Sequence, residues 1–98
     1  MIDIYICEDS DEQREIIRRY VKAAILIKEY DMKLKIATDD PEKIIEELKL
    51  SKNTGLYFLD IDLQAAKNGL TLAKEIREYD PRGFIVFVTS HSEMAFLT

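Results

Sequence analysis

The chain has 98 residues, a net charge of −5 and 47% hydrophobic residues, which allows one small domain over residues 1–98 with a core of its own and excludes a disordered chain. The acidic balance argues against a nucleic-acid-binding surface in this segment. The absence of a long apolar run and of a signal peptide, together with a single cysteine, Cys7, leads us to expect a cytoplasmic chain without a membrane span.

The first predicted strand ends in acid. Residues 2–7 form a short apolar run, and Glu8 and Asp9 follow it directly. Ser10 or Asp11 can then cap a helix. Apolar residues at three- and four-residue spacing predict the inward face of that helix: Ile16, Ile17, Tyr20, Val21, Ala24 and Ile27. A buried strand followed by a helix is typical of a parallel sheet.

The second strand is predicted at an edge of that sheet. Residues 32–37 alternate apolar side chains with Lys33 and Lys35, and lysines are a common device for protecting an edge. Asp39 or Asp40 stands before Pro41, which predicts a second helix with proline in its first turn. Its inward side chains are expected to be Ile44, Ile45 and Leu48.

The third strand again ends in acid, since Asp60 follows the apolar run 56–59. Asn68 and Gly69 predict a turn, and a third helical face follows, with Leu72, Ala73, Ile76 and Tyr79. The continuous apolar run 84–88 predicts a central strand, closed by Thr89 and Ser90, and His91 begins a further helix. With right-handed crossovers, this βαβαβαβ order predicts a parallel sheet covered by helices on both faces.

If the first and third strands are neighbours, Glu8, Asp9 and Asp60 meet at one edge of the sheet, because the carboxyl ends of parallel strands lie together. Two carboxylates ~4 Å apart repel by ~4 kcal/mol at an effective dielectric constant of about 20. Such a cluster calls for a cation, a proton or a function. Its oxygen ligands suit Mg²⁺, Mn²⁺ or Ca²⁺ better than zinc.

The ordered set of Glu8-Asp9, Asp60, Gly69 and Thr89 resembles the receiver domain of two-component response regulators. Asp60 follows Asp9 by 51 residues and precedes Thr89 by 29, close to the usual spacing. The phrases at 6–9, 57–61 and 87–93 are similar to receivers of the accessory-gene-regulator type, which carry a LytTR DNA-binding domain after the receiver.

The resemblance implies a flavodoxin-like (CheY-like) doubly wound parallel sheet of order 2-1-3-4. It also implies a signalling domain rather than an enzyme, in which Asp60 accepts a phosphoryl group from a sensor histidine kinase. Glu8, Asp9, Asp60 and the backbone carbonyl of Asp62 would hold Mg²⁺, and Thr89 would contact the phosphoryl group and act as the switch. Transcription would be controlled through a separate DNA-binding domain.

The sequence departs from the family pattern in two places. Gln64 and Ala65 stand where a proline is frequent, in a loop that is one residue longer than usual. The family also places a lysine after a fifth strand, whereas no Lys or Arg follows Arg82 here. We therefore expect a receiver without strand five and helix five, whose unpaired apolar strand edge favours a homodimer, either swapped or edge-paired.

Two other functions and several simpler roles remain open. Asp60 and Asp62 resemble the nucleophile and general acid of haloacid-dehalogenase-type phosphatases, although the strand that carries such a pair normally opens the fold. The chain could also be an interaction module that acts without phosphorylation. Glu8 and Asp9 could merely cap the first helix, and Cys7 is expected to be a buried apolar residue rather than a redox sensor.

Overall fold

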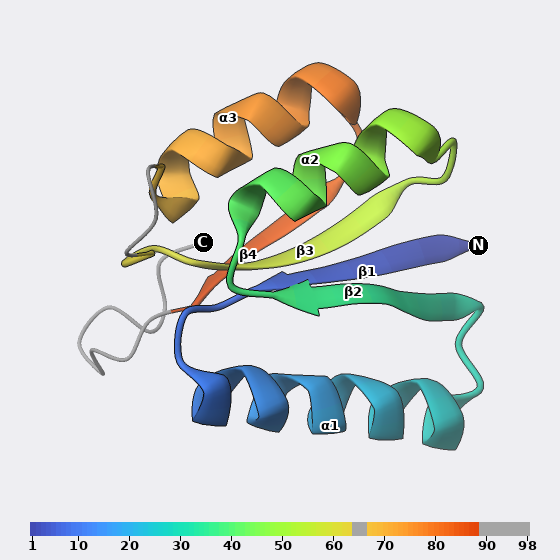
Figure 1. The fold of residues 1–98 in the computed structure, drawn as a ribbon. Helices are drawn as coiled ribbons and strands as arrows, with labels where there is room; N and C mark the ends of the chain where they lie inside the picture. The colour runs from blue at the N-terminus through green and yellow to red at the C-terminus, as the bar shows by residue number, and fades with distance from the viewer. Residues whose placement is uncertain (64–66, 89–98) are drawn as a thin grey trace.

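The computed structural model describes residues 1–63 and 67–88, which form a four-stranded parallel sheet between two layers of helices (Figure 1). In chain order the strands are β1 (Ile2–Cys7), β2 (Met32–Thr38), β3 (Gly55–Asp60) and β4 (Phe84–Val88). Their order across the sheet is β2-β1-β3-β4, and all three neighbouring pairs are parallel. The predicted order 2-1-3-4 is therefore confirmed.

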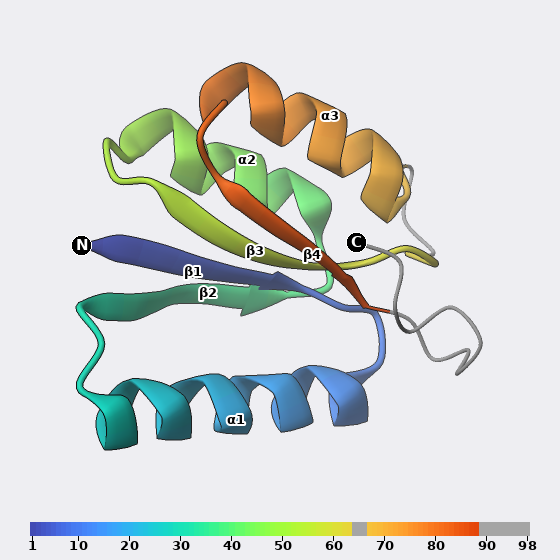
Figure 2. The same cartoon turned by 180° about the vertical axis from the view of Figure 1, so that it is seen from behind.

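Three helices connect the strands and cover both faces of the sheet. Helix α1 (Asp11–Lys28) lies on one face, and α2 (Pro41–Leu50) and α3 (Gly69–Tyr79) lie together on the other (Figures 1 and 2). Ser10 caps α1 and Asp40 caps α2. Ser10 accepts a hydrogen bond from the Gln13 amide at 3.2 Å, and Asp40 accepts one from the Glu42 amide at 3.0 Å. Side-chain oxygens at these positions satisfy amides that the helix itself leaves without partners.

The larger part of the core lies between the sheet and the α2–α3 layer. Tyr5 on β1 and Tyr57 on β3 are fully buried there, and their rings stack with centroids 4.8 Å apart. Asp80, directly after α3, accepts hydrogen bonds from the Tyr57 hydroxyl and the Gly55 amide, both at 2.8 Å. This contact joins the end of α3 to the amino end of β3, opposite the edge where the acidic residues lie.

The inward face of α1 is narrower than its sequence predicts. Val21 is buried, and Ile17 and Ile25 pack beside it against Ile4 and Ile6 of β1. Tyr20 and Ile27, by contrast, are each 75% exposed, and Ile16 and Ala24 are exposed as well. The expectation that these four residues face inward is wrong for the described residues. Among residues 1–63 and 67–88, α1 is the only helix on its face of the sheet (Figure 1) and contacts it along one stripe, so the apolar flank beyond that stripe lies outside the described core.

The two outer strands of the described sheet differ from each other in their charged side chains. β2 lies at an edge, as its lysines predict, and Lys35 pairs with Glu47 of α2 at 3.8 Å. Within residues 1–63 and 67–88, β4 pairs with β3 alone, so the strand predicted to be central lies at the other edge. β4 carries no charged residue, so the edge protection that β2 shows is missing there.

Several predicted features fall outside the described residues, namely Gln64, Ala65, Thr89, Ser90 and the helix expected from His91 onward. Among the helices that the structure describes, none has the length and apolar composition needed to cross a bilayer. The predicted homodimer stays a prediction.

Candidate functional site at the carboxyl edge of the sheet

The acids that follow β1 and β3 meet at the carboxyl edge of the sheet. Cys7 of β1 is in register with Leu59 of β3, so the next residues along the two strands, Glu8 and Asp60, are neighbours. Both side chains are almost buried, with 6% of each residue exposed. The pKa of Glu8 is raised to about 7, chiefly by burial and also by hydrogen bonding to Asp60 and the charges of Asp60 and Asp9, against a lowering by the Ser10 amide. Glu8 therefore keeps its proton to a higher pH than a solvent-exposed glutamate does.

The position of Glu8 is set on three sides. Its amide donates to the Thr38 carbonyl at the end of β2 at 3.0 Å, and its carboxylate accepts a hydrogen bond from the Ser10 amide at 3.0 Å. Its carbonyl oxygen accepts a hydrogen bond from Nη1 of Arg14 at 2.8 Å, and Nη2 of the same guanidinium pairs with Asp11. Sequence reasoning missed Arg14. The available signal was its place four residues after the cap Ser10, on the first turn of α1.

Asp60 is held by the backbone that follows it. The Asp62 amide donates to Oδ1 of Asp60 at 2.9 Å, and the Ile61 amide donates to the Val88 carbonyl at 3.1 Å. Gly69, the first residue of α3, lies directly against the Asp60 carbonyl, since a Cβ at Gly69 would be 2.2 Å from that oxygen. Glycine is required here because the backbones of β3 and α3 approach too closely for a side chain.

Asp9 lies near the same pair. Its charge helps to raise the pKa of Glu8, and Asp9 and Asp60 both help burial to raise the pKa of the Cys7 thiol to about 12. Cys7 is thus a buried, protonated thiol, as its sequence context predicts. The charges of Asp39 and Asp40, after β2, act on Cys7 as well. Three neighbouring strands therefore direct acids to one edge of the sheet.

The donor set fits a hard divalent cation. Its side-chain ligands are carboxylates, and Glu8 and Asp60 lie buried side by side, where a bound cation would offset the repulsion between their charges. Within residues 1–63 and 67–88, however, no three His, Cys, Asp or Glu side chains are already arranged as a metal site. Thr89 follows Val88, which is in register with Asp60, and itself lies outside the described residues.

A second positively charged side chain that sequence reasoning missed, that of Lys67, lies in the segment between Asp60 and α3. Lys67 pairs with Glu42 of α2 at 2.7 Å and also with Glu75 of α3. Its side chain is mostly buried, so two carboxylates satisfy an ammonium group that has lost much of its water. The last residues before α3 are thereby joined to both helices of that layer.

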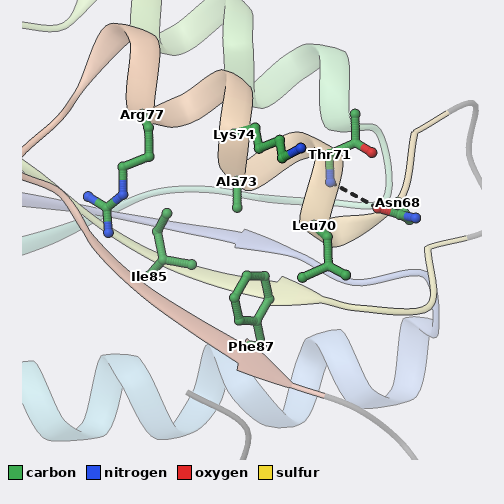
Figure 3. Close-up of a pocket in the computed structure, with 8 residues that line it drawn as sticks. All are labelled: Asn68, Leu70, Thr71, Ala73, Lys74, Arg77, Ile85 and Phe87. Atoms are coloured by element: carbon green, nitrogen blue, oxygen red, sulfur yellow. Dashed lines mark hydrogen bonds between the residues drawn. The ribbon is translucent and has the colours of Figure 1, made fainter.

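The groove between α3 and β4 is a different kind of place. It has a volume of about 600 Å³, and Leu70, Ala73, Ile85 and Phe87 supply its apolar part while Lys74 and Arg77 stand over it from α3 (Figure 3). None of the described residues that line it is an acid. Cation chemistry therefore belongs to the carboxyl edge and not to this groove.

Comparison with known proteins decides the family. The model of the response regulator receiver domain matches residues 4–98, nearly the whole chain. The chain belongs to the response regulator receiver family. β3, which carries Asp60, is the third strand of this receiver, whereas the corresponding phosphatase strand opens its fold, so topology and family together favour the receiver over the phosphatase.

The relatives of this receiver agree with the narrower resemblance. Over 95 residues it is 50% identical to accessory gene regulator protein A of Staphylococcus epidermidis (strain ATCC 12228 / FDA PCI 1200) and 47% identical to that of Staphylococcus aureus (strain N315). Each match covers 97% of this chain and 40% of the relative. The chain thus spans about two fifths of the length of these curated relatives, and the resemblance to accessory-gene-regulator receivers is confirmed.

A solved structure supports the fold independently. The MaeR response regulator bound to beryllium trifluoride superposes with a TM-score of 0.70 at 22% sequence identity, over 96% of this chain and 71% of that one. At this identity the match bears on the fold alone, and the CheY-like doubly wound architecture is confirmed.

Proposed function

We propose that this receiver accepts a phosphoryl group on Asp60, with Mg²⁺ held by Glu8, Asp9, Asp60 and the backbone carbonyl of Asp62. The observation that carries the proposal is that Glu8 and Asp60 lie buried beside each other at the ends of two neighbouring strands. Burial, helped by the adjacent Asp60, raises the pKa of Glu8 to about 7. A buried pair of carboxylates that retains a proton near neutral pH is poised to exchange it for a cation. The alternative that Glu8 and Asp9 merely cap α1 is less favoured, because the capping side chain is that of Ser10.

Each acid has a separate task in this proposal. Asp60 is the nucleophile, and the Asp62 amide on Oδ1 restrains the rotation of its carboxylate. Glu8 and Asp9, which follow β1, would place negative charge next to the cation that is bound beside Asp60. Bound Mg²⁺ would supply the positive charge that offsets the charge on the phosphoryl oxygens during transfer.

The transfer itself needs little from the protein beyond position. A carboxylate oxygen of Asp60 attacks the phosphorus of a phosphohistidine, the phosphorus–nitrogen bond breaks, and its electron pair remains on the imidazole nitrogen of the donor. Asp60 becomes an acyl phosphate. Because the transition state is loose, catalysis depends on alignment and charge neutralisation rather than on a further covalent group.

Membership of the family supports the remaining parts of the proposal. The donor is a sensor histidine kinase in the cytoplasm, and the chain is a signalling domain rather than an enzyme with its own substrate. The hydroxyl of Thr89 contacts the phosphoryl group and acts as the switch, because a hydroxyl beside a new dianion gains a charge-assisted hydrogen bond. The output is control of transcription by a separate DNA-binding domain of the LytTR type.

Mass spectrometry tests the acceptor directly. The chain is incubated with a small-molecule phosphoryl donor and Mg²⁺, and one phosphoryl group is expected on Asp60. Asp60→Asn is expected to abolish the addition, whereas Asp62→Asn, which keeps the backbone carbonyl, is expected to retain it. Unchanged phosphorylation in Asp60→Asn would refute the assignment of the acceptor.

If the chain is an interaction module that acts without phosphorylation, neither the unchanged chain nor Asp62→Asn should gain a phosphoryl group. These two proteins therefore separate the two functions.

A further inference from the structure

We propose that Arg14 is a positioning residue that holds the Glu8–Asp9 peptide group in the orientation required for divalent cation binding. The inference rests on the proposed metal site and adds to it a residue that does not itself touch the cation. It is based on the hydrogen bond, 2.8 Å long, from Nη1 of Arg14 to the carbonyl oxygen of Glu8, the first residue after β1.

The Arg14 bond acts on the Glu8 carbonyl, which neither the sheet nor the Ser10 amide holds. The Glu8 amide is anchored by the Thr38 carbonyl of β2, as a continuation of the sheet, and the Glu8 carboxylate is anchored by the Ser10 amide. The Glu8 carbonyl instead points to α1 and is reached by Arg14. With its amide and its carbonyl both fixed, rotation of Glu8 about ψ is restrained.

Peptide planarity carries this restraint to Asp9. The Glu8 carbonyl, the Asp9 amide and both flanking Cα atoms lie in one rigid plane. A hydrogen bond that fixes the Glu8 oxygen therefore fixes the starting direction of Asp9 as well. In this way one guanidinium sets the placement of Glu8 and Asp9, the two acids that follow β1, relative to Asp60.

The guanidinium is itself held in place. Its second nitrogen, Nη2, pairs with Asp11 on the same turn of α1, so the planar fork has one branch on a carboxylate and one on the Glu8 carbonyl. Two donor nitrogens at a fixed angle are a property of arginine and not of lysine, whose ammonium carries its three rotatable donors on a single nitrogen. Lysine at position 14 can keep the charge but cannot reproduce both contacts.

Electrostatics alone predicts the opposite effect, and this makes the inference testable. Arg14 lies on the first turn of α1, where the helix dipole disfavours cations, and beside a site that is to receive a divalent cation. If Arg14 acted only through its charge, its removal would tighten Mg²⁺ binding. If it acts by positioning the peptide, its removal weakens Mg²⁺ binding despite the loss of a repelling charge.

The experiment titrates Mg²⁺ alone into the chain and into three variants, and follows the backbone amide and carbonyl signals by NMR. The variants are Arg14→Ala, Arg14→Lys and the control Arg19→Ala. The control removes an equal charge from the same helix at a site where Arg19 is 75% exposed and pairs only with Glu15 at 3.4 Å among the contacts described. Thermal unfolding of each variant verifies the fold.

We expect Arg14→Ala to weaken Mg²⁺ binding about tenfold, in the range found when groups behind metal ligands are removed. Arg14→Lys is expected to weaken it nearly as much, and Arg19→Ala to change it less than about twofold. Without Mg²⁺, the carbonyl carbon of Glu8 and the amide of Asp9 should shift in both Arg14 variants, which reports the lost hydrogen bond itself. If Arg14→Ala does not fold, Arg14→Lys carries the test.

Unchanged or tighter Mg²⁺ binding in both Arg14 variants, with normal binding in the wild type, would overturn the inference and leave the proposed function standing. Full affinity in Arg14→Lys would overturn it too, because charge would then suffice. Absence of Mg²⁺ binding in the wild type would instead refute the proposed metal site, and the role of Arg14 with it.

Discussion

Magnesium binding should displace a proton from the Glu8–Asp60 pair. Burial of Glu8 and the adjacent Asp60 raise the pKa of Glu8 from 4.5 to about 7, so the cation-free site is protonated over much of the range below neutrality. A cation needs both carboxylates ionised.

The number of protons that Mg²⁺ should release follows from the pKa of Glu8. With a pKa of about 7, Glu8 holds about 0.9 proton at pH 6 and about 0.1 proton at pH 8, and Mg²⁺ binding should release these amounts. The same protonation lowers the apparent Mg²⁺ affinity at pH 6 about tenfold relative to pH 8.

Isothermal titration calorimetry in two buffers of different ionisation enthalpy counts the released protons at each pH. Glu8→Gln is the matched control, because it keeps the shape and removes the titrating group; it should bind Mg²⁺ more weakly but release almost no proton. Equal proton release at pH 6 and pH 8 in the wild type would refute the reasoning. So would a Glu8→Gln variant that retains the pH dependence.

Four further outcomes are expected. Without divalent cations, the free energy of unfolding should fall by up to about 3 kcal/mol as pH rises from 4.5 through 7, because the folded state binds the Glu8 proton more tightly than the unfolded state does. Chemical denaturation across this pH range measures the fall, and an unfolding free energy that does not change with pH would contradict it. Gly69→Ala should lose about 1–3 kcal/mol and shift the Asp60 amide, since its Cβ would overlap the Asp60 carbonyl, whereas an unchanged spectrum would rule out the close approach. Asp80→Asn should destabilise the chain by about 1–3 kcal/mol through weakened acceptance from the Tyr57 hydroxyl, and equal stability in urea would count against that clamp. The chain should self-associate through β4 in sedimentation and Val86→Lys should prevent it, while a wild-type chain that stays monomeric at every concentration would disprove edge pairing.

The sheet could be predicted because its signals are local. The apolar run that ends at Cys7, the lysines of β2 and the acid–proline start of α2 each follow from the requirements of a strand or a helix end. The neighbour relation of Glu8 and Asp60 then follows from strand order, since the carboxyl ends of adjacent parallel strands meet. For this reason the sequence alone predicts that Glu8 and Asp60 meet.

The remainder depends on geometry that spacing does not encode. Tyr20 and Ile27 fit the helical period of α1 as well as Val21 does, and only the position of α1 on the sheet separates the buried stripe from the exposed flank. Arg14 reads as a solvated charge until its guanidinium is seen on the Glu8 carbonyl. Lys67 likewise gains its meaning from Glu42 and Glu75, which come from two different helices.

The phosphoacceptor role of Asp60 is tested most directly by adding beryllofluoride, a mimic of the phosphoryl group, to the chain in the presence of Mg²⁺ while the amide spectrum is recorded. Saturable shifts at Asp60, Ile61 and Asp62 that vanish in Asp60→Asn are the predicted result. A spectrum that does not respond around Asp60, although the chain is folded and Mg²⁺ is present, would contradict the account.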